Sequence, residues 1–418
     1  MDATVTDSDR FDLILWGATG FTGSLVAQYL AQTPDCQDLR WALAGRNQTK
    51  LEEVRRQLGP DFQDLALLKA DCFDRDSLDA LVAQTKVICS TVGPYSEYGS
   101  ELVAACVEGG ADYCDLTGEA HWIRQMIDTH HEAATERGVR IVHCCGFDSI
   151  PSDLGTHLVQ QEAMRRFGNF CDEVKFYVWK IRGGVSGGTI ASVASTLEAA
   201  GEDRDIRRTL GDPYGLNPQG QRSGPDSSFQ SGPRRDKTIN AWTGPFVMAT
   251  INEKVVRRTN ALLDFRYGQK FRYSESSRVG KGIVGALRAG VMSAGFGAFG
   301  AGMMLKPTRK LLERFVLPAP GEGPSPESVE KGYFTVRLVG LGTSSENGRA
   351  FEINATVGAD KDPGYGATAI MLGESALCLA LDDIKDGLPG GILTPASAMG
   401  DTLIDRLRDA TMTFAVES

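Results

Sequence analysis

The sequence predicts an α/β fold, with an N-terminal Rossmann-type parallel sheet and a second α+β domain built on a largely antiparallel sheet. Three observations support this prediction. A short apolar strand at Phe11–Trp16 runs directly into a glycine-rich turn. Strand and helix patterns then alternate up to about residue 150, which is typical of a parallel sheet with helices on both faces. Between Tyr333 and Val357, two alternating runs flank a turn-rich segment, the pattern of an antiparallel hairpin.

Each element of the first 150 residues follows from a local pattern. Strands are expected at the short apolar runs 11–16, 41–44, 65–70, 87–92, 112–116 and 140–144. Helices are expected between them, where apolar residues recur at helical spacing, at 24–30, 51–58, 77–84, 101–108 and 122–137. This strict alternation is the basis for expecting a nucleotide-binding fold over residues 1–150.

The regular alternation of strands and helices ends after residue 150. We expect helices at 154–165, 190–200 and 367–381 and a strand at 173–179. Residues 212–236 are rich in Gly, Pro, Ser and Gln, which predicts a long and mobile surface loop. A second stretch of this kind, 318–328, has the composition of a linker.

An uncharged, glycine-rich apolar stretch makes up most of residues 283–305, and four basic residues follow between 306 and 314. Three interpretations stay open. The basic flank fits a helix that contacts a membrane surface or an acyl chain. The small residues permit close helix packing, which favours a buried or dimer-interface helix. A spanning helix needs about 20 apolar residues, and Arg288 interrupts the longer version of the segment.

Length and charge limit the class of protein. The chain has 418 residues, which is too many for one ordinary core, so we expect two domains. Its net charge of −10 argues against nucleic acid as a partner. The nine cysteines include no C-x-x-C pair, which indicates a reducing, cytoplasmic setting. The acidic N-terminus lacks an apolar stretch, so we expect no signal peptide.

The turn after the first strand is the most informative motif. Glycines at every third position let a pyrophosphate approach the backbone, and the following helix presents free N–H groups to it. The G-x-x-G-x-x-G spacing departs from the commoner G-x-G-x-x-G, and a glycine-rich loop without a ligand is the alternative. The candidate cofactor contacts in this turn are Gly17, Thr19, Gly20, Phe21, Thr22 and Gly23.

The second strand ends in Ala44-Gly45-Arg46, where an enzyme specific for NAD would carry an acidic residue. A guanidinium pairs with a 2′-phosphate as a fork, so Arg46 favours NADP. The alternative is that Arg46 lies in a surface turn. Asp71, which closes the third strand, is a candidate for the adenine edge or for a helix cap.

Three further strand ends carry polar residues at the edge where ligands bind in an open parallel sheet. Thr91, Gly93, Pro94 and Tyr95 follow the fourth strand and are candidates to lie beside the ribose and nicotinamide. Tyr95 is a candidate proton donor, or a ring that packs without titrating. Glu119 and Asp148 follow the fifth and sixth strands and are candidates to hold substrate or relay a proton. Asp148 can equally serve as a turn or N-cap residue of the next helix.

Two motifs that are missing from the sequence argue against particular kinds of site. The five histidines include no H-x-x-x-H pair, and we expect no metal site. The sequence also lacks the Tyr-x-x-x-Lys pair that short-chain dehydrogenases carry.

Taken together, these motifs resemble the saccharopine dehydrogenase-like oxidoreductases, and within them most closely the mycobacterial trans-acting enoyl reductase branch. The resemblance covers nearly the whole chain and lies in 17–23, 44–46, 91–95, 113–119, 145–153, 242–246, 257–261 and 391–400. It implies an NADP-binding Rossmann domain at 1–150 and a domain for substrate and dimerisation at 151–360. It also implies a segment at 361–418 that returns to the first domain.

We therefore expect an NADPH-dependent enoyl reductase that acts on a lipid or polyketide-type acyl substrate, either a small molecule or bound to a carrier. The apolar segment 283–305 suits a lipidic substrate better than an amino acid. Two alternatives are a saccharopine dehydrogenase-like enzyme with an amino-acid-derived substrate and a non-catalytic, lipid-associated NADP-binding protein. We further expect a cytoplasmic homodimer, with peripheral membrane contact through 283–305 as an open possibility.

Overall fold

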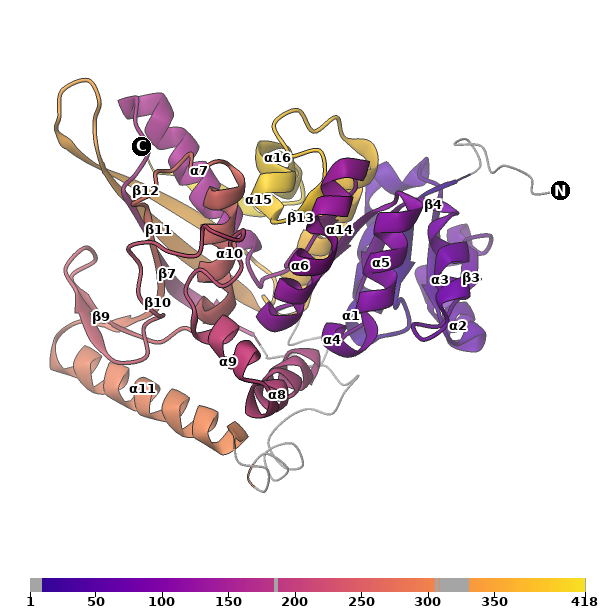
Figure 1. The fold of residues 1–418 in the computed structure, drawn as a ribbon, viewed down its shortest axis with the longest axis horizontal. Helices are drawn as coiled ribbons and strands as arrows, with labels where there is room; N and C mark the ends of the chain where they lie inside the picture. Colours follow the sequence, from indigo (N-terminus) through magenta and orange to yellow (C-terminus); the bar gives the residue numbers. More distant parts are fainter. Residues whose placement is uncertain (1–9, 184–186, 305–307, 309–330, 418) are drawn as a thin grey trace.

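Two seven-stranded β-sheets occupy opposite ends of the molecule, and helices fill the space between them (Figure 1). The structure is a computed structural model and describes residues 10–183, 187–304, 308 and 331–417. The predicted linker at 318–328 lies outside the described residues. Both the N-terminal parallel sheet and the largely antiparallel second sheet confirm the predicted fold class.

The first sheet has the strand order β13-β6-β5-β4-β1-β2-β3, and every pairing in it is parallel. Its strands are β1 (Phe11–Trp16), β2 (Trp41–Gly45), β3 (Ala66–Lys69), β4 (Thr85–Ser90), β5 (Asp112–Asp115), β6 (Arg140–Val142) and β13 (Gly391–Leu393). The first six correspond to the predicted strands. Strand β13 comes from near the C-terminus, and its Ile392 pairs with Ile141 of β6.

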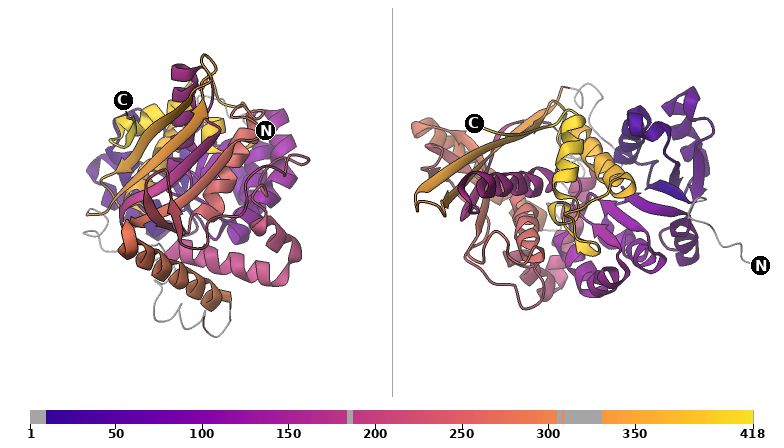
Figure 2. Two further views of the ribbon diagram at one scale, coloured as in Figure 1. Left: turned by 90° about the vertical axis from the view of Figure 1, so that its left-hand side faces the viewer. Right: turned by 90° about the horizontal axis from the view of Figure 1, so that it is seen from above.

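Helices cover both faces of this sheet (Figure 2). They are α1 (Phe21–Gln32), α2 (Gln48–Leu58), α3 (Arg75–Val82), α4 (Tyr95–Tyr98), α5 (Ser100–Gly109), α6 (Ala120–Arg137) and α14 (Gly366–Leu381), with short 3-10 turns at Pro34–Gln37 and Pro60–Phe62. Helix α14 packs against β4, β5 and α1, so a segment distant in sequence completes one face.

The second sheet has the order β14-β12-β11-β7-β10-β9-β8, and only the pairing of β10 with β7 is parallel. Its strands are β7 (Glu173–Arg182), β8 (Arg234–Asp236), β9 (Ala241–Gly244), β10 (Arg272–Gly280), β11 (Tyr333–Thr343), β12 (Ala350–Ala359) and β14 (Thr413–Val416). Strands β11 and β12 form the predicted hairpin. The chain end contributes β14 here, so the C-terminal segment reaches both sheets.

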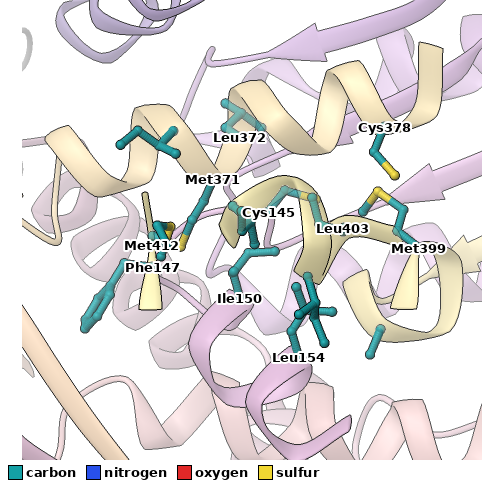
Figure 3. Packing of buried hydrophobic residues seen from close by; sticks show 14 of the residues in the cluster. Cys145, Phe147, Ile150, Leu154, Met371, Leu372, Cys378, Met399, Leu403 and Met412 are labelled. Atoms are coloured by element: carbon teal, nitrogen blue, oxygen red, sulfur yellow. The ribbon is translucent and has the colours of Figure 1, made fainter. Parts of the chain in front are cut away.

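Between the sheets lie α7 (Ile150–Phe167), α10 (Ala249–Leu262), α15 (Pro395–Ala398) and α16 (Gly400–Asp409) (Figure 1). They join the two halves through one continuous apolar cluster (Figure 3). In this cluster, Phe147 and Leu154 contribute from around the start of α7, and Met371 and Leu403 contribute from α14 and α16. This cluster contains residues of both sheets and thus connects the two halves of the molecule.

The loop at 212–236 contains no helix or strand before β8, as predicted, but it is held against α10, whose Arg257 donates to the Pro213 carbonyl oxygen at 3.1 Å. Tyr214, Leu216 and Asn217 are buried. The Arg257 guanidinium forms an ion pair with Asp226 at 2.8 Å, with both side chains almost fully buried. The remaining helices, α8 (Gly187–Glu202), α9 (Arg204–Gly211) and α11 (Gly282–Met304), lie along one side of the molecule (Figure 1).

Candidate functional site

The glycine turn between β1 and α1 forms an open backbone cradle. Gly17 has a backbone φ of +87°, a conformation that residues with a side chain rarely adopt. A Cβ atom at Gly23 would lie 2.2 Å from the Gly17 carbonyl oxygen, so only glycine allows the helix to begin this close to the strand. Gly20 is the N-cap of α1, and no side chain caps the helix. The first-turn N–H groups therefore remain available to an anion.

Thr91, directly after β4, ties this turn to the centre of the sheet. Its Oγ1 atom lies 3.1 Å from the Gly17 carbonyl oxygen and 3.2 Å from that of Trp16, and it donates to this pair. The hydroxyl of Thr91 thus holds the shape of the turn. Gly93 and Pro94 follow and lead into α4.

Arg46 is exposed at the carboxyl end of β2. Burial raises the pKa of the Cys72 thiol, and the Arg46 charge opposes that rise, so the guanidinium acts on the segment that follows β3. Phe73 in this segment is 71% exposed. Its ring meets that of Tyr98 at 5.7 Å, edge to face. Arg46 and this aromatic pair bound the area where the adenosine end of a dinucleotide would lie.

Asp71 shapes the segment after β3. Its Oδ1 atom accepts a hydrogen bond from the Phe73 backbone N–H at 3.0 Å. Its own N–H donates to Ser77 Oγ at 3.0 Å. The N-cap of α3 is Asp74, not Asp71. Asp71 therefore supports the turn that presents Phe73. An exposed aromatic residue carries no sequence signal of its own, and sequence reasoning missed Phe73 and Tyr98.

The cradle and the basic side chain fit a dinucleotide with a 2′-phosphate. Uncapped helix amides are suited to a pyrophosphate, and an exposed guanidinium is suited to a phosphate monoester. Gly17, Thr19, Gly20, Phe21, Thr22 and Gly23 would hold the pyrophosphate end, and Arg46 the 2′-phosphate.

Tyr95 is buried, with only 3% of its surface exposed. Its hydroxyl donates to the Ser90 carbonyl oxygen at 3.1 Å, and its ring lies 5.6 Å from that of Trp122. Burial raises the pKa of this hydroxyl well above its usual value. In this conformation the Tyr95 hydroxyl is engaged with the sheet.

Glu119 is fully buried and accepts three hydrogen bonds. Its carboxylate accepts the backbone N–H groups of Tyr95 at 2.8 Å and Ser96 at 3.0 Å, which are the first residues of α4. It also accepts the Ser192 hydroxyl of α8 at 2.9 Å. Glu119 thus caps a short helix and joins α8 to the edge of the first sheet. Sequence reasoning missed Ser192, because only the fold brings α8 to this place.

Asp148 follows β6 and is partly buried. Burial raises the pKa of its carboxyl to about 7. A Cβ atom at Gly118 would lie 3.4 Å from Asp148 Oδ2, so the carboxyl is close to the residues that follow β5. Within the described ranges, no hydrogen bond to this carboxyl is present. Ser149, not Asp148, is the N-cap of α7, and its side chain makes no cap bond.

Ser149 has a φ of +105°, an uncommon and strained conformation for a residue with a side chain. Its hydroxyl donates to Asn252 Oδ1 of α10 at 3.0 Å, and both residues are buried. The strained turn that directly follows Asp148 is thereby tied to α10.

Tyr95, Glu119 and Asp148 therefore come together at the carboxyl ends of the adjacent strands β4, β5 and β6. Tyr95 and Glu119 already have hydrogen-bond partners there, whereas Asp148 offers a carboxyl that titrates near neutral pH. Among the described residues, no cluster of three His, Cys, Asp or Glu side chains could hold a metal ion.

Comparison with known proteins places this geometry in context. The family described as the saccharopine dehydrogenase NADP-binding domain matches residues 13–142. A Mycobacterium tuberculosis protein, provisionally named a trans-acting enoyl reductase, is 43% identical over 410 residues, covering 95% of each chain. The trans-acting enoyl reductase of Mycobacterium bovis is 40% identical over 411 residues, covering 96% of each. That of Mycobacterium ulcerans is 39% identical, covering 95% of this chain and 96% of the other.

Among solved structures, the fold is similar to that of the glutamate-forming saccharopine dehydrogenase from Saccharomyces cerevisiae. The TM-score is 0.54 at 13% sequence identity, covering 97% of this chain and 99% of the other. At this identity the likeness concerns the fold alone.

Proposed function

Since the chain belongs to the saccharopine dehydrogenase-like family, alongside the trans-acting enoyl reductases, we propose that it reduces the carbon–carbon double bond of an enoyl thioester with NADPH. The relatives confirm the family resemblance, and the matching domain confirms NADP as the expected cofactor. The names of the relatives imply an oxidoreductase. The acyl substrate and the residue roles below are our proposal.

Bound NADPH would supply a hydride from the nicotinamide C4 atom to the β-carbon of the substrate. The protein's task is to position the two reactants and to complete the reaction with a proton. The turn at Gly17–Gly23 would hold the pyrophosphate, and Arg46 the 2′-phosphate. Both groups lie at the carboxyl edge of the first sheet, as does Asp148.

Asp148 carries the proposal, because its carboxyl is the candidate acid at this edge that titrates near neutral pH. Addition of hydride to the β-carbon breaks the double bond and leaves an enolate. Protonated Asp148 would then donate its proton to the α-carbon, which yields the saturated thioester and the Asp148 carboxylate. Glu119 and Tyr95 act as positioning residues, since they hold α4 and the segment at 93–96 in place.

The acyl chain is proposed to be of lipid or polyketide type and to be presented on a carrier. Two features support this choice. The relatives are named as trans-acting, and the apolar helix α11 packs against α8, which reaches the candidate site through Ser192. An amino-acid-derived substrate would instead need convergent cationic groups at the strand ends. We further propose that the protein works in the cytoplasm as a homodimer.

Isotope transfer tests this proposal. Purified protein is incubated with a medium-chain 2-enoyl thioester and NADPH deuterated at C4, and the product is analysed by mass spectrometry and NMR. We expect one deuterium at the β-carbon, and in deuterated water a solvent-derived deuterium at the α-carbon. Turnover of saccharopine-like amino acids but not of enoyl thioesters would contradict the substrate class. Tight NADPH binding without turnover of either class would favour a non-catalytic binding protein.

A further inference from the structure

Helix α11 presents a long apolar face to solvent. It runs along the outer edge of the second sheet, away from the core (Figure 1). An 18-residue window within the 22 residues Gly282–Met303 has a mean hydropathy of 1.3, yet only 11% of this window is buried. Its most exposed large side chains are Ile283 at 81%, Val291 at 74%, Leu287 at 66% and Val284 at 60%. An apolar surface of this size on a globular protein marks an interaction site.

The other face of α11 is packed, and this limits how the helix can be used. Ala289 and Met303 are fully buried. Gly285 lies against Gly280, where a Cβ atom would come within 2.6 Å of the Gly280 backbone, and Met292 reaches Gly244 in the same way. Phe296 meets Phe229 at 6.4 Å. Because one side is fixed to β9 and β10, the helix has a single free face. Such a helix suits a surface in its own plane better than a transverse span.

The charge around α11 indicates which kind of partner its exposed face fits. The chain as a whole carries a net charge of −10, but the segment 281–314 contains six basic residues and one acidic residue. Lys281 and Arg288 are both exposed. At helical spacing, Arg288 lies at the margin of the apolar face, where its stem can cover apolar surface while its charge reaches outward. A face of Ile, Leu and Val with a basic margin matches the acyl region and anionic headgroups of a lipid bilayer.

A second copy of the chain matches this face less well. Helix α11 contains no acidic residue, and its charge is Arg288. An isologous contact between two α11 helices would therefore bring cations together without counter-charges from the helices. We propose that α11 docks in the plane of an anionic lipid surface through Ile283, Val284, Leu287 and Val291. This proposal does not depend on which substrate the protein reduces.

The consequence is a short path from a lipid surface to the candidate site. Helix α8 packs against α11, and its Ser192 donates to Glu119 beside Tyr95. The docked face and the strand-end edge of the first sheet therefore share one helix. A hydrophobic substrate that partitions into the bilayer would be concentrated on that side of the molecule.

Vesicle sedimentation of the full chain tests the proposal. We expect the protein to sediment with phosphatidylcholine vesicles that contain phosphatidylglycerol, and less with pure phosphatidylcholine. Val291→Asp is expected to weaken partitioning about tenfold or more, because it places a charge in the apolar face. Lys281→Glu with Arg288→Glu is expected to weaken the preference for anionic vesicles, because it reverses two of the six basic charges in 281–314. Leu381→Asp, an exposed apolar position at the end of α14, is the matched control and should bind as wild type.

The other outcomes are informative as well. Retained NADPH binding and an unchanged unfolding midpoint establish that each variant is folded. Failure of the wild type to sediment, or wild-type sedimentation by Val291→Asp, would overturn the proposal. Resistance to extraction by alkaline carbonate would indicate a spanning helix and overturn the in-plane arrangement. A wild-type dimer that Val291→Asp dissociates, without vesicle binding by either protein, would assign the face to a second copy.

Discussion

The Glu119 carboxylate lies 2.8 Å from the backbone nitrogen of Tyr95 and accepts its hydrogen bond from a fully buried position. With the further bonds from Ser96 and Ser192, this one side chain caps α4 and connects α8 to the first sheet. The segment at 93–96, which is expected to border the nicotinamide, therefore depends on a residue from the next strand end.

Replacing Glu119 with Gln tests this role. The Gln side chain would direct an N–H group at one of the backbone donors, so a buried donor loses its acceptor. We expect the free energy of unfolding to fall by about 2–3 kcal/mol, the usual cost for a bond to a charged group. NADPH affinity should fall with it, as measured by urea unfolding and fluorescence titration. If Glu119 instead relays a proton, Glu119→Gln would keep its stability and cofactor affinity and lose only turnover.

Arg46→Ala tests the assignment of the 2′-phosphate contact. Loss of one charge-assisted, forked interaction at this exposed side chain corresponds to about a 10–100-fold weaker Kd for NADPH. The Kd for NADH should stay unchanged, because NADH has no phosphate there. Arg55→Ala, on α2 and away from the turn, is the matched control. An unchanged ratio of the NADPH and NADH affinities in Arg46→Ala would show that Arg46 does not determine the preference for NADPH.

Gly23→Ala and Gly201→Ala make a matched pair within helices. At Gly23 an added Cβ atom would lie 2.2 Å from the Gly17 carbonyl oxygen, whereas at Gly201 it meets nothing within 4 Å. Gly201→Ala should raise the free energy of unfolding by about 0.5–1 kcal/mol through helix propensity. Gly23→Ala should lower it and abolish NADPH binding, because the turn must open. The measurements are calorimetric unfolding and NADPH titration of both variants. Unchanged NADPH binding by Gly23→Ala would show that the turn at Gly17–Gly23 does not hold the cofactor.

The sequence predicted elements well where a pattern repeats locally and less well where contacts are distant. Alternation and the glycine spacing were sufficient for the six leading strands and for the turn before α1. Nothing in the run Gly391–Leu393 shows that it pairs with β6, because three apolar residues fit many environments. The loop at 212–236 has a mobile composition, yet Asp226 is held by Arg257 of α10, which lies 31 residues later in the sequence.

At the site, residue type predicted location but not role. Glu119 and Asp148 both follow a parallel strand, so both could be placed at one edge. Their roles differ because of neighbours that are far away in sequence. Ser192 and the α4 amides donate hydrogen bonds to the Glu119 carboxylate, whereas burial alone raises the pKa of Asp148. The exposure of α11 could not be predicted from its composition either, because a buried helix can have the same apolar composition.

Asp148→Asn tests the proton donor by kinetics. Wild-type kcat should fall as the pH rises through about 7, because the proposed donor must be protonated and its pKa lies near that value. Asp148→Asn should lower kcat about 10²–10⁴-fold and remove this dependence, with little change in the Kd for NADPH. The measurement is the rate of NADPH oxidation with an enoyl thioester across the pH range. An unchanged pH profile in the variant would assign the proton to another group.

The same substitution makes a separate prediction for stability. Burial raises the pKa of Asp148 from 3.8 to about 7, so between these values the folded protein holds a proton that the unfolded chain has released. This group's contribution to the free energy of unfolding therefore falls as the pH rises from about 4 to about 7. Asp148→Asn should be more stable than wild type at pH ~8, by up to about 4 kcal/mol, and the difference should shrink toward pH ~4.

Buried Glu275 and Asp153 have pKa values raised in the same direction, to about 7 and about 6, so wild-type stability alone cannot isolate Asp148. The difference between wild type and Asp148→Asn at each pH removes these shared contributions. Urea unfolding at several pH values supplies that difference, with exposed Asp61→Asn as the control. Because the catalytic and the stability effects follow from one buried carboxyl, a variant that changes neither pH dependence would show that this carboxyl is already ionised in the folded protein at neutral pH.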